Sequence, residues 1–173
     1  TSEYANQNAY DCVSVHGGSG FIMEYKAQRL LRDARIFSIY EGTTQLQVVA
    51  AVRYITNGTY LGIMREMLAE DVCDCMKPLR DRMAKLVDLY EEAVEKVKAD
   101  ENQDEHDFLA RRMYNMTGDI ILSLLLLRDA TNVPEEFAKS ANVYVRMAEE
   151  ECVGGHAYIM NFKADDLSSF VAE

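Results

Sequence analysis

Apolar and polar residues follow each other along most of this chain with the period of an α-helix. After Pro78, apolar residues recur at steps of three or four positions as far as Val97, which is typical of a helix with one buried face. The members of this stripe are Leu79, Met83, Leu86, Tyr90, Val94 and Val97. No segment alternates with the period of a strand. The pattern therefore predicts an all-α protein that folds as an antiparallel helical bundle.

Helix-ending residues divide the rest of the chain into further predicted helices. Gly17-Gly18 and Asn57-Gly58 follow periodic segments, and Gly adopts the left-handed conformation of a helix end without a steric cost. Residues 100–107 contain five acidic and no apolar side chains, so they are predicted to be a loop. The other predicted helices are residues 2–16, 24–35, about 44–56, 59–76, about 107–129, and a last one from Pro134 that ends near Gly154-Gly155.

The charge of the chain is unevenly distributed. The formal net charge is −11, which argues against a nucleic-acid-binding protein because phosphate contacts need clustered Lys and Arg. Residues 1–58 contain five basic and five acidic side chains, so residues 59–173 carry the entire net charge. This difference predicts two parts, residues 1–58 and residues 59–173, with different surfaces.

The cysteines and histidines do not form a recognisable metal or disulfide pattern. Cys73 and Cys75 are separated by one residue, which is too close for a Cys-x₂₋₄-Cys zinc motif, and we expect reduced thiols. His106 lies among acidic residues without a second ligand at helical spacing and is interpreted as part of a solvated loop. No apolar run approaches the length of a membrane span, so a cytoplasmic protein is expected. Because the chain begins with Thr1, we also expect it to be part of a longer protein.

Glu41 is the residue whose surroundings favour chemistry most clearly. It stands in an apolar, aromatic segment at residues 37–42, and partial desolvation there is expected to raise the carboxyl pKa and make Glu41 a better base near neutral pH. Gly42 permits the close approach of a ligand, while Thr43, Thr44 and the helix that they open offer donors to an anionic group. From these features alone, the alternative is an ordinary helix start with a favourable acid nearby.

Three motifs in order resemble the C-terminal α-domain of acyl-CoA dehydrogenases, over about residues 5–57. They are Ser14-Val15-His16-Gly17-Gly18-Ser19-Gly20-Phe21, Arg32-Asp33-Ala34-Arg35-Ile36 and Ile39-Tyr40-Glu41-Gly42-Thr43-Thr44-Gln45-Leu46-Gln47. The remainder resembles, in general character, a helical extension found in longer members of that family. The Arg-Asp-Ala-Arg run is interpreted as structural, with ion pairs that fix the following loop.

The resemblance implies a catalytic role for the loop. Glu41 would remove the α-proton of an acyl-CoA thioester, and its backbone N–H would stabilise the negative charge that develops on the thioester carbonyl. Gly42 would lie against the substrate, and Tyr40 would line the acyl pocket. Hydride would pass from the β-carbon of the substrate to FAD.

The resemblance also implies cofactor contacts and partners. Thr43 and Gln45 would contact the FAD diphosphate, and the FAD of a neighbouring subunit would pass over Gly17 and Gly18. An electron-transferring flavoprotein would accept the electrons, and the protein would be a homo-oligomer. Because most of the flavin-binding part of the family is missing from this sequence, we expect the chain alone to be inactive. The alternative is a non-catalytic helical module for oligomerisation or partner docking.

Overall fold

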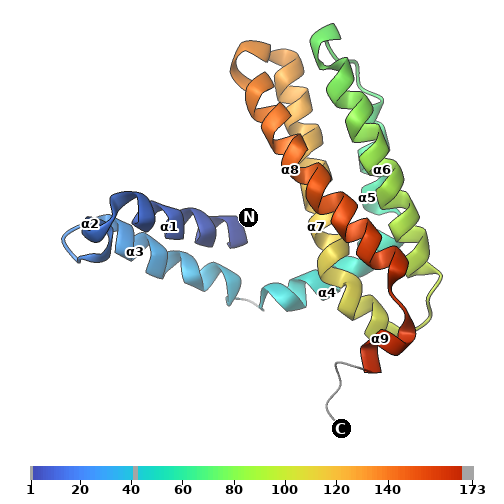
Figure 1. The fold of residues 1–173 in the computed structure, drawn as a ribbon, viewed down its shortest axis with the longest axis horizontal. Coiled ribbons are helices and arrows are strands. Elements are labelled where there is room, and N and C mark those ends of the chain that lie inside the picture. The colour runs from blue at the N-terminus through green and yellow to red at the C-terminus, as the bar shows by residue number, and fades with distance from the viewer. Residues whose placement is uncertain (1, 41–42, 169–173) are drawn as a thin grey trace. The chain divides into compact units, whose positions relative to one another are not determined.

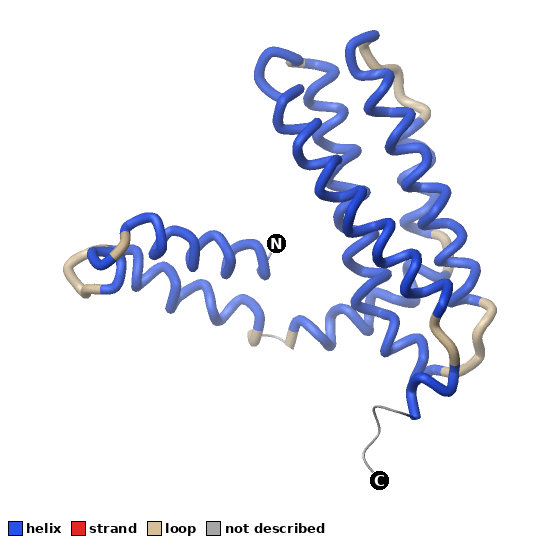
Figure 2. Tube along the Cα trace, viewed as in Figure 1, coloured by secondary structure: helices blue, strands red, loops and turns tan. Residues whose placement is uncertain are grey.

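The computed structural model describes residues 2–40 and 43–168, which contain helices and connecting loops and no strand (Figure 2). The all-α prediction is therefore confirmed. The elements are α1 Ser2–His16, α2 Gly18–Phe21, α3 Lys26–Ala34, η1 Arg35–Ser38, α4 Thr44–Thr56, α5 Thr59–Leu68, η2 Asp74–Met76, α6 Lys77–Lys98, α7 Gln103–Asn132, α8 Pro134–Asn161 and α9 Ala164–Ser168.

By packing, the chain divides within α4 into two compact units, Thr1–Gln47 and Val48–Glu173. The division falls there because Val48 and Val52 of α4 are buried together with Ala110 of α7. Most of α4 therefore belongs to the second unit. The boundary predicted between residues 58 and 59 stays a prediction.

The second unit is an antiparallel bundle in which α6, α7 and α8 lie side by side and α5 packs along α6 and α7 (Figure 1). Every residue of the apolar stripe predicted for residues 79–97 is buried, with at most 3% of its surface exposed. Methionines of α5, α6 and α7 also lie in the core, where Met64, Met83, Met113 and Met116 are buried. The bundle predicted from the apolar pattern is thus confirmed.

A hydrogen bond between α6 and α7 lies inside this core. Tyr90 has no exposed surface, and its hydroxyl is 2.9 Å from the hydroxyl of Thr117. The Thr117 hydroxyl in turn donates to the carbonyl of Met113 at 2.7 Å. Because the Thr117 hydroxyl has a single hydrogen, the Tyr90 hydroxyl is the donor to it. Burial raises the pKa of Tyr90 to about 12.

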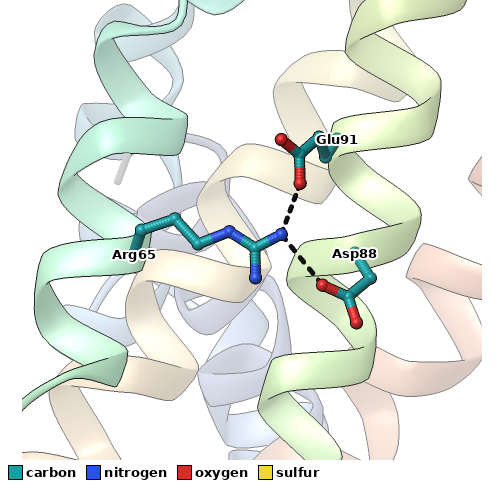
Figure 3. Close-up of polar contacts among 3 residues, drawn as sticks. All are labelled: Arg65, Asp88 and Glu91. Carbon is teal, nitrogen blue, oxygen red and sulfur yellow. Dashed lines mark hydrogen bonds and ion pairs between the residues drawn. The ribbon is translucent and has the colours of Figure 1, made fainter.

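Arginine side chains link neighbouring helices at the bundle surface. Arg65 of α5 reaches across to α6, where it pairs with Asp88 at 2.9 Å and with Glu91 (Figure 3). The other links join Arg82 to Glu149 and Arg128 to Glu70. Partly exposed pairs of this kind contribute little to stability.

The prediction that the last long helix ends near Gly154-Gly155 is wrong, because α8 continues to Asn161. A Cβ added to Gly155 would meet the Cγ and Sδ atoms of Met116 at 3.2 Å, whereas one added to Gly154 would meet nothing within 4 Å. Gly155 therefore allows α8 to approach α7 closely. His156, which follows this glycine pair, lies inside α8, and its Nε2 is 2.9 Å from a carboxylate oxygen of Glu92 of α6.

Two other helix bounds differ from those predicted. The helix from Thr59 ends at Leu68 instead of reaching Met76, and Pro78 then stands in the first turn of the next helix, where its missing N–H costs no hydrogen bond. Helix α7 begins at Gln103, inside the acidic segment predicted to be a loop. The side chain of Asn102 caps it by accepting from the Asp104 amide at 3.0 Å, and acidic residues are favourable in a first helical turn.

The first unit is a hairpin of α1 and α3 joined through α2 (Figure 1). None of the residues of α1 is buried, and α3 buries only Ala27 and Ala34. Large apolar side chains such as Phe21 and Phe37 are more than half exposed. This unit therefore has almost no hydrophobic core of its own.

The adjacent glycines of α8 give a matched pair of variants. Gly154→Ala should raise the free energy of unfolding by about 0.5–1 kcal/mol, because Ala is favoured over Gly within a helix and its Cβ meets open space. Gly155→Ala should give a smaller gain or a loss, because Met116 must move. Urea unfolding followed by circular dichroism measures both, and a larger gain for Gly155→Ala would contradict the proposed close approach.

Tyr90→Phe should lower the free energy of unfolding by about 1 kcal/mol, because it removes a hydrogen bond and keeps the ring packing. The substitution should also change how the free energy of unfolding depends on pH in the alkaline range. Tyr90 ionises near pH 10 in the unfolded chain and near pH 12 in the folded one, so the wild type loses up to about 3 kcal/mol as the pH rises through this window.

Tyr90→Phe should lose less free energy of unfolding than the wild type over this pH range, as measured by denaturant unfolding at a series of pH values. A residual slope is expected in both proteins because burial also raises the pKa of Cys152 to about 12. Tyr10→Phe, at an exposed ring, is the control and should keep the wild-type slope. Equal slopes for wild type and Tyr90→Phe would contradict this interpretation.

Candidate functional site

The candidate base Glu41 and its neighbour Gly42 lie outside the described residues, and the structure places the residues on either side of them. Before them, Tyr40 has its amide 2.8 Å from the carbonyl of Ile36, and 65% of its surface is exposed. After them, Thr43 leads into α4. The aromatic loop predicted at residues 37–42 begins inside the short helix η1.

Thr43 is the residue that opens α4. Its hydroxyl accepts from the amide of Leu46 at 3.4 Å, and its carbonyl accepts from the amide of Gln47 at 3.2 Å. This is the geometry of a helix N-cap, which satisfies an amide that has no partner within the helix. Gln45 lies exposed in the first turn of α4, on the same unit. Both predicted diphosphate-contacting residues therefore lie at one helix N-terminus.

Ser38 connects η1 to the start of α4 by hydrogen bonds, a role not predicted from the sequence. The Arg35 guanidinium donates to the Ser38 hydroxyl, and the Thr44 hydroxyl donates to the Ser38 carbonyl at 3.4 Å. The chain before the candidate base is thereby tied to the helix that follows it. The charged guanidinium of Arg35 thus donates to a neutral hydroxyl, while Asp33 pairs with Arg29 inside α3 at 3.4 Å. The spacing of three residues between Arg35 and Ser38 is the feature of the sequence from which this hydrogen bond could have been predicted.

Gly17 and Gly18 lie at the other end of the hairpin, where α1 turns into α2. Gly17 has a φ of +59°, a conformation that favours glycine, and Gly18 has nothing within 4 Å of the position of an added Cβ. Gly20 differs, because a Cβ there would lie 2.5 Å from the Val13 carbonyl oxygen. Packing within the chain thus requires Gly20 but not Gly18.

The two predicted groups of site residues are separated by α3. This helix of nine residues spans about 13 Å, with the turn of α2 before it and the candidate loop after it. Within the hairpin, the structure therefore brings Tyr40, Thr43 and Gln45 to one region and Gly17 and Gly18 to another.

Other polar groups singled out from the sequence make structural contacts. The imidazole Nε2 of His106 is 2.8 Å from the carbonyl of Asp100, in the first turn of α7. Within residues 2–40 and 43–168, no three His, Cys, Asp or Glu side chains gather as a metal site requires. Among the helices that the structure describes, none combines the length and apolar character needed to cross a membrane.

Each of the two parts of the chain matches a known protein family. The family described as "Acyl-CoA dehydrogenase C terminal" matches residues 56–167, and the family described as "Acyl-CoA dehydrogenase, C-terminal domain" matches residues 1–55. The chain belongs to the acyl-CoA dehydrogenase family. A crystal structure of an acyl-CoA dehydrogenase family protein from Porphyromonas gingivalis is similar, with a TM-score of 0.61 and 31% identity over 66% of this chain and 98% of that one.

Curated relatives match a short part of this chain and of their own length. The caffeyl-CoA reductase-Etf complex subunit CarC of Acetobacterium woodii is 52% identical over 46 residues, which are 27% of this chain and 12% of the relative. An acyl-CoA dehydrogenase of Bacillus subtilis is 41% identical over 58 residues, 34% of this chain and 15% of the relative. A 3-(aryl)acrylate reductase of Clostridium sporogenes is 48% identical over 46 residues, 27% and 12% of the two chains. The matched region is thus a small share of each of these relatives.

The N-cap at Thr43 gives a local test of the site geometry. Thr43→Ala should speed hydrogen exchange of the Leu46 amide by up to about tenfold, because loss of a capping hydroxyl costs roughly 0.5–2 kcal/mol and this bond is long. Thr43→Ser keeps the hydroxyl and should leave the rate close to that of the wild type. Equal rates for all three proteins, measured by NMR, would show that the hydroxyl does not cap α4.

Proposed function

We propose that this chain is the C-terminal part of an FAD-dependent oxidoreductase that acts on the Cα–Cβ bond of acyl-CoA thioesters, with Glu41 as the catalytic base. The observation that carries the proposal is the family match along the chain, together with the motif that contains Glu41. The names of the relatives support it. They describe dehydrogenation of acyl-CoA and reduction of caffeyl-CoA and arylacrylates, which are opposite directions of one reaction type.

The residues around the loop support a base at this position. Tyr40 and η1 place apolar and aromatic side chains next to Glu41 in the chain, and burial of this segment in the full-length protein would raise the pKa of a carboxylate there toward the working pH. The Ser38 contacts limit the movement of the chain on both sides, as positioning of a catalytic group requires. Glu41 would take the α-proton, Gly42 would leave room for the thioester, and Tyr40 would line the acyl pocket.

Members of this family generally use FAD, and several residues fit such a group. FAD, when bound, would accept the hydride from the β-carbon of the substrate. The hydroxyl of Thr43, the amide of Gln45 and the N-terminus of α4 are suited to hold a diphosphate, because a helix N-terminus favours negative charge. Gly18 supports the fit, because its missing side chain leaves a space that packing within the chain does not use.

The resemblance to the family supports a homo-oligomer, and the separation of the two groups of residues by α3 is compatible with it. Gly17 and Gly18 would contact one flavin, and the loop with Thr43 and Gln45 would contact another, bound mainly by a different subunit. The electron acceptor would be an electron-transferring flavoprotein, in keeping with the Etf complex in the name of CarC. Because the chain matches only 12% to 15% of these relatives' lengths, the isolated chain would be inactive.

Glu41→Gln in the full-length protein tests the catalytic role. The variant should keep bound FAD, seen in the visible spectrum, and lose acyl-CoA dehydrogenation by at least about 100-fold, because a general base contributes a factor of this size. It should also stop exchange of the substrate α-proton with deuterated solvent. Glu24→Gln, at an exposed turn residue of the same hairpin, is the matched control and should retain activity. Normal turnover by Glu41→Gln would overturn the proposal.

A further inference from the structure

Cys73 and Cys75 form a pair of neighbouring thiols in the segment that joins α5 to α6. Their sulfur atoms lie 2.7 Å apart, compared with about 2.05 Å in a disulfide bond. Both are free thiols; Cys73 is half-buried and Cys75 is exposed. The pair is therefore open to solvent on one side and supported by the protein on the other.

The backbone turn holds the two thiols together. Cys73 has an extended conformation directly before η2, and its carbonyl accepts from the amide of Met76 at 2.9 Å. Met76 is buried in the bundle core, and Cys73 also packs against that core. Asp74, between the thiols, pairs with Lys77 at 2.5 Å in the same turn. The turn is thus fixed at both ends, and the thiols meet without rearrangement of the helices.

We propose that Cys73 and Cys75 are a redox-active dithiol that exchanges with low-molecular-weight or protein disulfides. The exposed Cys75 thiolate attacks one sulfur of the external disulfide, whose S–S bond breaks and releases one thiolate. The Cys73 thiolate then attacks the Cys75 sulfur, forms the Cys73–Cys75 bond and releases the second thiolate. Two protein thiols are oxidised, one external disulfide is reduced to two thiols, and the protons of the cysteines pass to the released thiolates through solvent.

The short ring indicates reversible chemistry and not structural reinforcement. A disulfide that encloses three residues removes little conformational entropy from the unfolded chain, since this effect grows with loop length. Its formation would fix the α5–α6 turn and change the bundle little elsewhere. The site uses none of the residues proposed for flavin or substrate, so it stands independently of the proposed function.

The other cysteines differ in ways that make them internal controls. Cys152 has no exposed surface, and burial raises its pKa to about 12, which leaves almost no reactive thiolate. The sulfur of the half-buried Cys12 faces the imidazole of His16 at 3.8 Å. The hydrogen bond to Cys73 raises the pKa of Cys75, so exchange is best observed at mildly alkaline pH.

Mass spectrometry of the complete chain after incubation with glutathione disulfide tests the proposal. The wild type should lose two hydrogen atoms in the peptide that contains Cys73 and Cys75, without a lasting glutathione adduct there. Cys73→Ser and Cys75→Ser should instead each accumulate one stable adduct on the remaining thiol. Cys12 should carry a stable adduct in all three proteins. Reaction of glutathione disulfide with the chain unfolded in guanidinium is the control that shows the reagent to be active.

Two results would overturn the proposal. One is a wild type that keeps glutathione on Cys73 or Cys75 as stably as the single variants do. The other is a folded wild type in which both thiols stay reduced while the unfolded chain reacts. Because these thiols lie in a turn that is partly exposed, serine at either position should leave the helical circular dichroism unchanged, which separates a lost thiol from a lost fold.

Discussion

The close packing of α7 against α6 and α8 is the interaction on which the rest of the structure depends. Gly155 lets α8 approach Met116 of α7, and Tyr90 of α6 donates to Thr117 of α7 inside the core. Large fully buried side chains surround these contacts, and their burial supplies most of the hydrophobic stabilisation. Within the same unit, Ala110 of α7 is buried together with Val48 and Val52 of α4.

The candidate site lies in a unit of a very different kind. The hairpin of α1 and α3 buries almost nothing, and its contacts are short-range hydrogen bonds such as those of Ser38. A loop supported by this hairpin has few of the interactions that stabilise the bundle. Stability and proposed chemistry are thus divided between the two units, which is why the effects of a variant on each can be measured separately.

The sequence predicted what depends on periodicity and local backbone conformation. The buried stripe of α6, the helical class and the bounds of α1 follow from spacing and from Gly17, whose positive φ the structure shows. Predictions from the sequence were wrong where the same residue type occurs in two different structural contexts. Gly155 resembles a terminator but serves helix packing, and the acids after residue 100 resemble a loop but include the first turn of α7. The role of Glu41 came from resemblance, because spacing alone cannot show what an acid in an apolar loop binds.

Hydrogen exchange measured along the whole chain tests this division most directly. Amides in the middle of α6, α7 and α8 should exchange only through global unfolding, whereas those of α1 and α3 should exchange through local opening at least about a hundredfold faster. Equal protection of the hairpin and the bundle would contradict the account, because it would show that α1 and α3 are held by a core of comparable strength.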